Sequence, residues 1–362
     1  MGLIKNKNGL LIGGILLGCI LGIYIWNTGA IKKDRVLYSI QYKESKTALV
    51  GISLDNYQVI RNIKLDKNYN NIAVHNDNAY ISVYRDTDKV GLMRSGKEFR
   101  KLNLSSPQLG KTVTMDGHTP TDILVLDDKV LIETRFLNRS PVASGFEVYD
   151  EQLNFLYNIN FEEAYVSFKW KVIEKKYIIV LANKLGEDDI HDWKTVAIKI
   201  DYKNHEILDK RVIYDSDFYD FDLMENDLVI TFVDRDQEKD NSKTKQHDIW
   251  TLNINSYDLK KIMKIESEPI KLYSIANKNR LLIADHNKIN IINYKERSLL
   301  KSIQIPGIRD WIIKDNKLCV NQRFLLTNFY QGDPQITIVD LDSYQVIKEI
   351  KGTFGTFAKT VN

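Results

Sequence analysis

Short segments with alternating apolar and polar residues recur along most of this chain. In the clearest copies, two such segments are joined by a turn, as in TVAIKIDYKNHEIL from Thr195 and QITIVDLDSYQVIKEI from Gln335. A period of two residues predicts β-strands with one buried face, and no long helical period interrupts the pattern. From Val36 onwards, the chain is therefore predicted to be all-β.

A second recurring element is a polar tripeptide followed by a run of β-branched or aromatic residues. Asn76-Asp77-Asn78 precedes AYISV, Glu225-Asn226-Asp227 precedes LVITF, and Asn277-Lys278-Asn279 precedes RLLIA. Such tripeptides are typical of tight turns that lead into a strand. The two elements alternate, so each repeat unit is predicted to contain four antiparallel strands.

Seven such units can be counted by the polar residue at the turn between the third and fourth strands. These marker residues are Asp55, Ser95, Asp150, Asp201, Asn255, Asn293 and Asp340, and successive differences give spacings of 40, 55, 51, 54, 38 and 47 residues. Four-stranded units of this length, repeated seven times, predict a β-propeller with one blade per unit. A six-bladed or open ring is the alternative.

Residues 36–362 resemble the seven-bladed propeller superfamily with YVTN and quinoprotein-like repeats. The resemblance is clearest in NKNRLLIADHNKINIINYKERSLLKSIQI (277–305), and in NKLCV together with QITIVDLDSYQVIKEI (316–350). It implies the fold but leaves the activity open, because many unrelated functions share this scaffold. The tryptophan docking motif of quinoproteins does not recur, so no cofactor is predicted.

The first unit lacks an innermost strand, because it begins at Val36 with VLYSIQY directly before the second element. Thr353–Val361, with the sequence TFGTFAKTV, is a candidate for the missing strand. We expect it to pair beside Val36–Tyr42 and close the ring, which removes two exposed sheet edges.

The N-terminal region contains 17 residues without a charge, from Leu10 to Trp26. This length lies at the short end of what crosses a bilayer, and Tyr24 and Trp26 suit the headgroup level. We predict a tail (1–9), a transmembrane signal anchor (10–26), a linker (27–35) and an extracytoplasmic propeller (36–362) at the cell membrane. A lipoprotein, with Leu16–Cys19 resembling a lipobox, and a cleaved signal peptide remain alternatives.

The charge distribution argues against nucleic acid as a partner. The chain carries 51 basic and 48 acidic residues, and residues 1–36 hold five of the basic and one of the acidic ones. The remainder has 51 − 5 = 46 basic and 48 − 1 = 47 acidic groups, a net charge of −1. Nucleic-acid binding depends on neutralising phosphates, and the predicted propeller has no excess of positive charge for it.

Long connections are predicted on one face of the propeller. Turns between the first and second strands, and between the third and fourth, lie on the opposite face and are short. The long segments are 105–121, 136–144, 183–193, 234–246 and 324–334. Loops of unequal length on a rigid scaffold favour binding at this face, while tolerated surface variation is the other interpretation.

A basic side chain follows the second strand of each unit, and these side chains would surround the channel mouth on the long-loop face. Converging cations suit an anionic ligand, although neighbouring aspartates such as Asp86 and Asp234 could neutralise them. Trp193 ends one of the long loops. The candidate ligand-binding residues are Arg85, Arg135, Arg235, His286, Arg323 and Trp193, with Lys43 and Lys184 completing the basic set.

The sequence indicates no catalytic residue and no metal site. It has no GxSxG elbow, P-loop or GxGxxG motif, and no histidine pair at metal-ligand spacing. Acidic pairs such as Asp86-Thr87-Asp88 lack the Gly and distal Glu of an EF-hand loop. Cys319 is expected to be an inert core thiol, and the tryptophans are expected to pack between blades, with exposure on the rim as the alternative.

These observations favour a binding, scaffold or accessory module for a protein or an anionic surface ligand. Two alternatives remain open. One is a lyase or hydrolase of a cell-surface polymer or lactone, which needs a metal ion or paired carboxylates. Asp86, Asp189, Asp234 and Asp285 would then converge, together with His191 or His286. The other is a quinoprotein-like redox protein.

Overall fold

The computed structural model describes residues 35–43, 46–87, 93–95, 97–106, 109–115, 118–136, 144–163, 165, 167–185, 193–233, 247–266, 268–322 and 334–359. The predicted anchor at residues 10–26 lies outside them. Within these ranges, no helix has both the length and the apolar character needed to cross a membrane.

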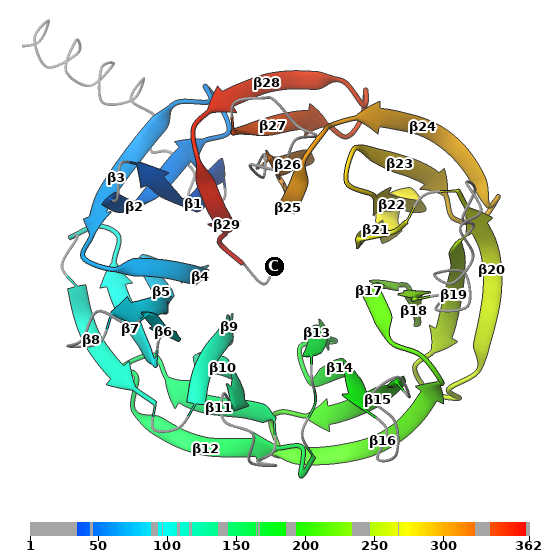
Figure 1. The fold of residues 1–362 in the computed structure, drawn as a ribbon, viewed down its shortest axis with the longest axis horizontal. Coiled ribbons are helices and arrows are strands. Elements are labelled where there is room, and N and C mark those ends of the chain that lie inside the picture. The colour runs from blue at the N-terminus through cyan, green and yellow to red at the C-terminus, as the bar shows by residue number, and fades with distance from the viewer. Residues whose placement is uncertain are drawn as a thin grey trace, which may run out of the picture.

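The described strands form seven sheets arranged around a central axis (Figure 1). We letter the strands of each blade A to D from the axis outwards. From A to D, blade 1 contains β29 (Phe354–Phe357), β1 (Val36–Lys43), β2 (Lys46–Ser53) and β3 (Val59–Leu65). Blade 2 contains β4 (Asn68–His75), β5 (Asn78–Thr87), β7 (Glu98–Asn103) and β8 (Leu109–Thr114). Blade 3 contains β9 (His118–Leu126), β10 (Lys129–Phe136), β11 (Gly145–Asp150) and β12 (Phe155–Asn160).

Blades 4 to 7 follow the same order without interruption along the chain. Blade 4 contains β13 (Ser167–Ile173), β14 (Tyr177–Leu185), β15 (Trp193–Asp201) and β16 (Glu206–Tyr214), and blade 5 contains β17 (Phe218–Met224), β18 (Asp227–Phe232), β19 (His247–Asn253) and β20 (Leu259–Ile265). Blade 6 contains β21 (Lys271–Ile275), β22 (Arg280–Ala284), β23 (Lys288–Asn293) and β24 (Ser298–Gln304). Blade 7 contains β25 (Ile308–Lys314), β26 (Lys317–Gln322), β27 (Gln335–Asp340) and β28 (Val346–Lys351).

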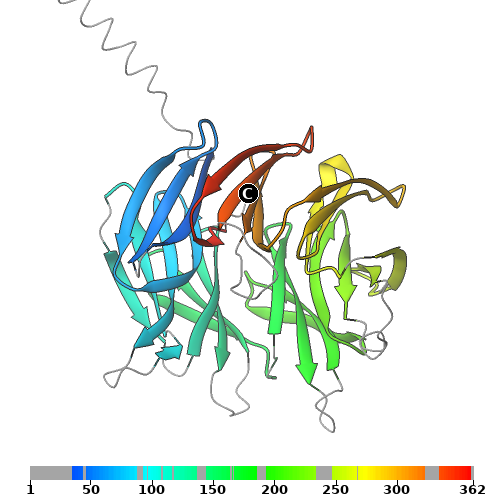
Figure 2. The same cartoon turned by 45° about the horizontal axis from the view of Figure 1, so that its top comes forward.

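All pairings within the blades are antiparallel, and Figure 2 shows the blades side by side around the ring. The predicted all-β propeller with four-stranded blades is confirmed, and the number of blades is seven.

Blade 2 differs from the sequence-based assignment. The short strand β6 (Met93–Ser95) is an addition that pairs with β5, and strand C is β7 rather than a segment before residue 95. Strand D, β8, lies within residues 105–121. The prediction that these residues form a single long connection is therefore wrong. β8 has the sequence LGKTVT, whose few apolar residues give little alternation.

The C-terminal strand closes the ring as predicted. β29 pairs antiparallel with β1 through Ser39 opposite Phe357 and Gln41 opposite Phe354. The amide of Asn321 in blade 7 donates to the carbonyl oxygen of Phe354 at 3.0 Å and to that of Gly355. The chain then continues to blade 2, where the Lys359 N–H donates to the Ile72 carbonyl at 2.9 Å. Blade 1 is therefore built from both ends of the described chain.

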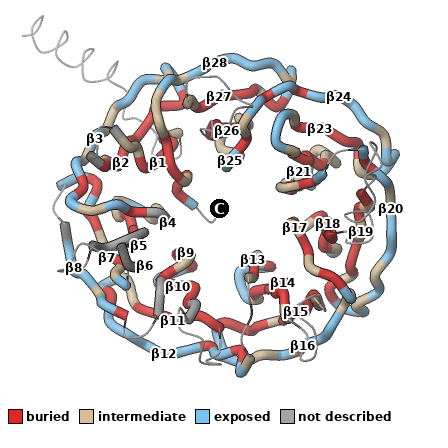
Figure 3. The backbone as a smooth tube through the Cα atoms, in the orientation of Figure 1, coloured by how far each residue is buried: buried red, intermediate tan, exposed pale blue. Residues whose placement is uncertain are grey.

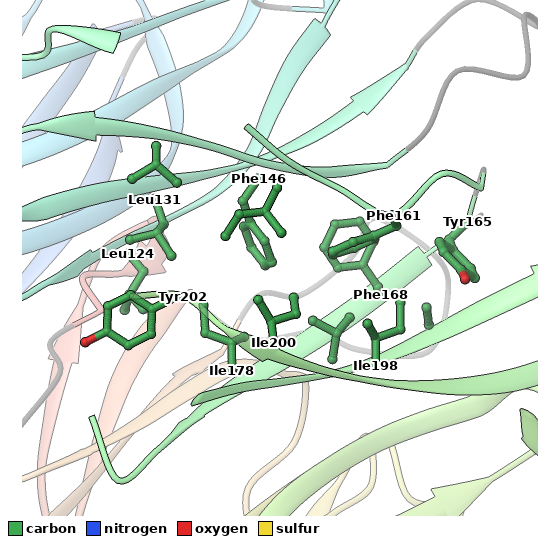
Figure 4. Close-up of a cluster of buried hydrophobic side chains, with 14 of the residues drawn as sticks. Leu124, Leu131, Phe146, Phe161, Tyr165, Phe168, Ile178, Ile198, Ile200 and Tyr202 are labelled. Atoms are coloured by element: carbon green, nitrogen blue, oxygen red, sulfur yellow. The ribbon is translucent and has the colours of Figure 1, made fainter. Parts of the chain in front are cut away.

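The core is divided among the interfaces between blades. Within the described residues, the buried apolar side chains form seven clusters, each shared by two neighbouring blades. Figure 4 shows the cluster between blades 3 and 4, where Phe146, Phe161 and Phe168 meet edge to face. Figure 3 shows that the middle strands of the blades, such as β22, β23 and β26, are the most buried, whereas outer strands such as β24 and β28 are more exposed.

The packing bears on two predictions about single side chains. Interblade packing is confirmed for three tryptophans, Trp170, Trp250 and Trp311. Cys319 is fully buried in the cluster between blades 7 and 1, and burial raises the pKa of its thiol to about 12. A thiol with such a pKa stays protonated and unreactive at neutral pH.

The turns between strands C and D share one capping position, the last residue of strand C. Its side-chain oxygen accepts backbone N–H groups of the turn in every blade; the seven residues are Ser53, Asn103, Asp150, Asp201, Asn253, Asn293 and Asp340. The predicted markers Asp55 and Asn255 lie in these turns, two residues after the capping residues Ser53 and Asn253. The marker Ser95 is wrong, because it belongs to β6, and the capping residue of blade 2 is Asn103. The differences between successive capping positions are 50, 47, 51, 52, 40 and 47 residues.

Candidate functional site

The connections between strands define two faces of different character. The A–B and C–D turns lie together on what we call the short-turn face. The B–C and D–A connections lie on the opposite side, which we call the loop face. Four B–C connections there are long: Phe136 to Gly145, Leu185 to Trp193, Phe232 to His247, and Gln322 to Gln335. In blade 2, the B–C connection from Thr87 to Glu98 contains β6.

The predicted ligand-binding residues all belong to B–C connections or to the strand ends beside them. Arg85 lies near the end of β5 and Arg135 near the end of β10. Arg235 and Arg323 lie outside the described residues. His286 is exposed in the short turn between β22 and β23, and Trp193 is half-buried as the first residue of β15. Whether these side chains converge on a ligand stays a prediction.

Two residues near this predicted set already have local roles. The ammonium group of Lys184, at the end of β14, lies 3.4 Å from Glu163, which also pairs with Lys210. The carboxylate of Asp285 accepts the N–H groups of Asn287 and Lys288 at 2.7 and 2.8 Å. Lys184 is therefore neutralised locally, and Asp285 shapes its own turn.

A second set of charged residues lies on the innermost strands. Lys169 and Lys171 of β13 pair with Asp220 and Asp222 of β17, at 2.9 and 2.8 Å. The same two carboxylates accept backbone N–H groups of β21, from Leu272 at 2.8 Å and Ser274 at 2.7 Å. These contacts join the innermost strands of blades 4, 5 and 6.

Similar contacts join the next blades. Lys271 of β21 lies 2.5 Å from Asp310 of β25, whose second oxygen accepts the N–H of Phe357 in β29 at 3.3 Å. Beyond β29, the ammonium group of Lys359 pairs with Asp122 of β9. Blades 6, 7, 1 and 3 are thereby linked by side chains at the axis.

Two neutral hydrogen-bond donors join blade 3 to its neighbours on either side. Trp170 of β13 donates to Glu133 of β10 at 3.2 Å, joining blades 4 and 3. Asn71 of β4 donates to the Thr121 carbonyl at 2.6 Å, joining blades 2 and 3. We call this set the inner belt; its members are Asn71, Asp122, Glu133, Lys169, Trp170, Lys171, Asp220, Asp222, Lys271, Asp310 and Lys359.

The lysines and carboxylates of the inner belt differ in exposure. The Lys171 side chain is 37% exposed and that of Lys359 is 47% exposed, whereas Asp222 is 8% exposed and Asp122 is 17% exposed. Four lysines and five carboxylates give 4 − 5 = −1. The belt has no excess positive charge, so it provides little attraction for a free anion.

The pKa values of two belt lysines reflect this pairing. Burial disfavours the charged form of Lys171, but the Coulombic attraction and hydrogen bond of Asp222 outweigh it and raise the pKa. For Lys359, whose side chain is only partly exposed, the loss of hydration is likewise outweighed by Asp122, and the pKa of the ammonium group is raised. Both lysines stay charged at neutral pH, which makes them poor proton acceptors.

The described residues give no sign of a metal centre. Among them, no three or more His, Cys, Asp or Glu side chains are grouped as metal ligands would be. The aspartates expected to converge in the enzyme alternative include Asp189 and Asp234, which lie outside the described residues. The belt instead holds neighbouring blades at a fixed spacing, through charge-assisted hydrogen bonds.

The inner belt was missed in the sequence, although its signal is visible there. Lys169-Trp170-Lys171 and Asp220-Phe221-Asp222 place equal charges two residues apart on innermost strands. In a strand, residues i and i+2 lie on one face. Such a pair at equivalent positions of successive units indicates an ion-pair ladder between neighbouring blades.

Comparison with known proteins shows the fold. No family model matches the sequence, and no curated protein matches it either. Solved structures that share the fold include Kuenenia stuttgartiensis hydrazine synthase, with 9% identity over 84% of this chain and 94% of that chain, and a TM-score of 0.61. Dihydro-heme d1 dehydrogenase NirN in complex with DHE has 8% identity over 89% and 74%, with a TM-score of 0.55. Apo AztD from Citrobacter koseri has 11% identity over 89% and 97%, with a TM-score of 0.52. At these identities, the likeness supports the fold alone.

Proposed function

We propose that this protein is a membrane-anchored, extracytoplasmic propeller that binds a protein or an anionic surface ligand on its loop face. The proposal places the anchor at residues 10–26 and assigns the chain to propellers with YVTN or quinoprotein-like repeats. The propeller serves in this proposal as a rigid scaffold or accessory module rather than as a catalyst.

The observation that carries the proposal is the contrast between the two faces. The short-turn face repeats one capped turn in all seven blades, whereas the B–C connections of the loop face range from the short turn Asp285–Lys288 to the span between Phe232 and His247. Variable loops on a scaffold that is tightly held at its axis are where binding sites usually lie. No described cluster of side chains favours the enzymatic alternatives.

The test is recovery of partners from detergent-solubilised membranes. The double variant Arg85→Glu/Arg323→Glu reverses two charges of the loop face, and Lys175→Glu/Lys203→Glu reverses two on the short-turn face as a matched control. We expect partner recovery to fall at least about tenfold in the first variant, as for the loss of charge-assisted contacts, and to be unchanged in the second.

Circular dichroism and thermal unfolding would establish that both variants are folded. Equal recovery from the loop-face variant and the wild type would reject the role of these arginines. Loss of recovery in the control alone would move the binding site to the short-turn face.

A further inference from the structure

The exposed apolar side chains are unevenly placed on the propeller. Within the described residues, nine large apolar side chains are exposed, and all lie on strand D of a blade. Eight of them occupy the first three positions of that strand, directly after the C–D turn; these are Val59, Phe155, Leu156, Leu208, Leu299, Leu300, Val346 and Ile347. They therefore lie at the edge of the short-turn face.

Five of the eight lie on three consecutive blades. Leu299 and Leu300 of blade 6 are 60% and 42% exposed, Val346 and Ile347 of blade 7 are 45% and 40% exposed, and Val59 of blade 1 is 48% exposed. We call these five residues the rim patch. Figure 3 shows the outer strands β24 and β28 largely exposed at this part of the ring. Exposed aliphatic groups that are concentrated in one part of a surface are typical of contact surfaces.

Basic residues accompany the rim patch. Arg297, Lys301 and Lys348 lie within two residues of it along the chain, and none of them forms an ion pair with another described residue. The seven D strands together hold eleven Lys or Arg residues and three Asp or Glu residues. Lysines on edge strands discourage pairing with a further strand, which argues against strand addition from a second copy.

The described chain also begins beside this patch. The Arg35 guanidinium lies 2.5 Å from Asp55, in the C–D turn of blade 1, and 2.7 Å from Asp315, in the A–B turn of blade 7. The Arg35 carbonyl accepts the Leu54 N–H at 2.8 Å. These contacts fix the start of the propeller at the short-turn face, between blades 1 and 7.

The length of the preceding chain limits where a bilayer could lie. Residues 27–34 separate the apolar segment Leu10–Trp26 from Arg35. Eight residues span at most roughly 30 Å when fully extended. If the apolar segment crosses a membrane, as the proposed function holds, the short-turn edge of blades 7 and 1 must therefore stay close to the bilayer surface.

We propose that the rim patch rests on the anionic surface of the membrane that holds the anchor. The aliphatic side chains of Leu299, Leu300, Val346 and Ile347 enter the interface, while Arg297, Lys301 and Lys348 meet the lipid phosphates. Blades 6, 7 and 1 face the bilayer, and the loop face points away from it. The inference rests on the proposed anchor and adds the orientation in which the loop face meets its partner.

The test uses the full chain inserted into vesicles of phosphatidylcholine and phosphatidylglycerol. In a Cys19→Ser background, the remaining native thiol, Cys319, is buried. Leu300→Cys and Ile347→Cys place a fluorescent label in the patch, and Val212→Cys, 55% exposed near the far end of a D strand in blade 4, is the matched control. Lipids with a spin-labelled headgroup quench labels that lie at the interface.

We expect quenching at positions 300 and 347 to be at least about twofold stronger than at 212, because apolar and basic groups settle at the interface. Lys301→Glu/Lys348→Glu should remove most of this difference in vesicles with phosphatidylglycerol. Equal quenching at all three positions, in protein that floats with the vesicles, would overturn the inference and leave the anchor standing. Protein that fails to float with the vesicles would overturn both the proposed anchor and the inference about the rim patch. If a second copy of the chain covers the rim patch in detergent, the inference would also be overturned.

Discussion

At the scale of single residues, one side-chain oxygen shapes the C–D turn of each blade. Asp340 accepts the N–H groups of Asp342 and Ser343 at 3.1 and 2.8 Å, and the Ser343 hydroxyl at 2.8 Å. The turn then places Tyr344 at φ 55, a left-handed conformation that is unusual for a tyrosine. The capping oxygen therefore stabilises a turn whose backbone would not form readily without it.

Asp340→Ala tests this role. We expect the free energy of unfolding to fall by about 1–2 kcal/mol, because the substitution removes three hydrogen bonds from the turn. Asp258→Ala is the control, since Asp258 is exposed in the equivalent turn of blade 5 and changes the charge equally. It should stay within about 0.5 kcal/mol of the wild type. Urea unfolding followed by tryptophan fluorescence measures both, and equal losses would argue against the cap.

The capping role also predicts a pH dependence. Hydrogen bonds from the Ser343 backbone and hydroxyl hold the pKa of Asp340 below its ordinary value. A lowered pKa in the folded state contributes stability above the unfolded pKa of about 3.9, and this contribution is lost as the pH falls through the folded value. The stability difference between the wild type and Asp340→Ala should therefore be constant above about pH 5 and shrink below about pH 4. A difference that grows on acidification would contradict this assignment.

The turns could be predicted from the sequence, but their register could not. Turns are indicated by segments rich in polar residues at the ends of predicted strands, such as SLDNY, NINSY and LDSY. Two polar residues stand two positions apart in several of them, as in Asn253 and Asn255. Either could cap the turn by composition alone, and the hydrogen bonds to the backbone N–H groups distinguish them.

At the scale of elements, neighbouring blades are joined by the inner belt at the axis and by apolar clusters further out. Asp222 illustrates the belt, because its two oxygens accept from Lys171 of blade 4 and from the backbone of blade 6. A carboxylate that is only 8% exposed depends on these partners. The charged residues of the belt are visible in the sequence. Their pairing could not be predicted, because it depends on which innermost strands are neighbours and on how residues along those strands are aligned.

Lys171→Met tests the belt. We expect it to lower the free energy of unfolding by about 2 kcal/mol, because the nearly buried Asp222 side chain then lacks its lysine partner. Adding Asp222→Asn should recover part of the loss. Lys64→Met, an exposed lysine of β3, is the control and should change stability by less than about 0.5 kcal/mol. A double-mutant cycle with no coupling between positions 171 and 222 would show that the pair does not hold the blades together.

The closing strand was predicted correctly because the first repeat unit lacked an innermost strand. Its contacts are extensive: Phe354 and Phe357 are each 2% exposed in the cluster between blades 7 and 1. There is also little room at Gly355, where an added Cβ would lie 2.8 Å from the Tyr42 ring. The same reasoning failed for β8, because a strand with little alternation leaves no period to detect.

A chain ending at Gly352 tests the closure. We expect it to lose roughly 5 kcal/mol or more of stability, because two buried phenylalanines are removed and the edge of β1 is left unpaired. It should also associate through that edge, which size-exclusion chromatography would detect. A chain ending at Lys359 keeps every described closing contact and should unfold at the temperature of the full chain. A ring that stays equally stable without β29 would contradict the closure.

At the scale of the whole molecule, the seven interblade clusters, the inner belt and the closing strand hold the described blades as one ring. Such a ring keeps the B–C connections at fixed positions relative to one another. One face then carries repeated capped turns, and the other carries connections of unequal length. The second of these faces, the loop face, is the one that we expect to meet the partner.

Photo-crosslinking in intact membranes tests this claim most directly. A benzoylphenylalanine at His286 samples the loop face, and one at Lys175 samples the short-turn face of blade 4, away from the rim patch. We expect a discrete adduct with a partner at 286 and none at 175. A partner adduct at 175 with none at 286 would place binding on the short-turn face and contradict the proposed function.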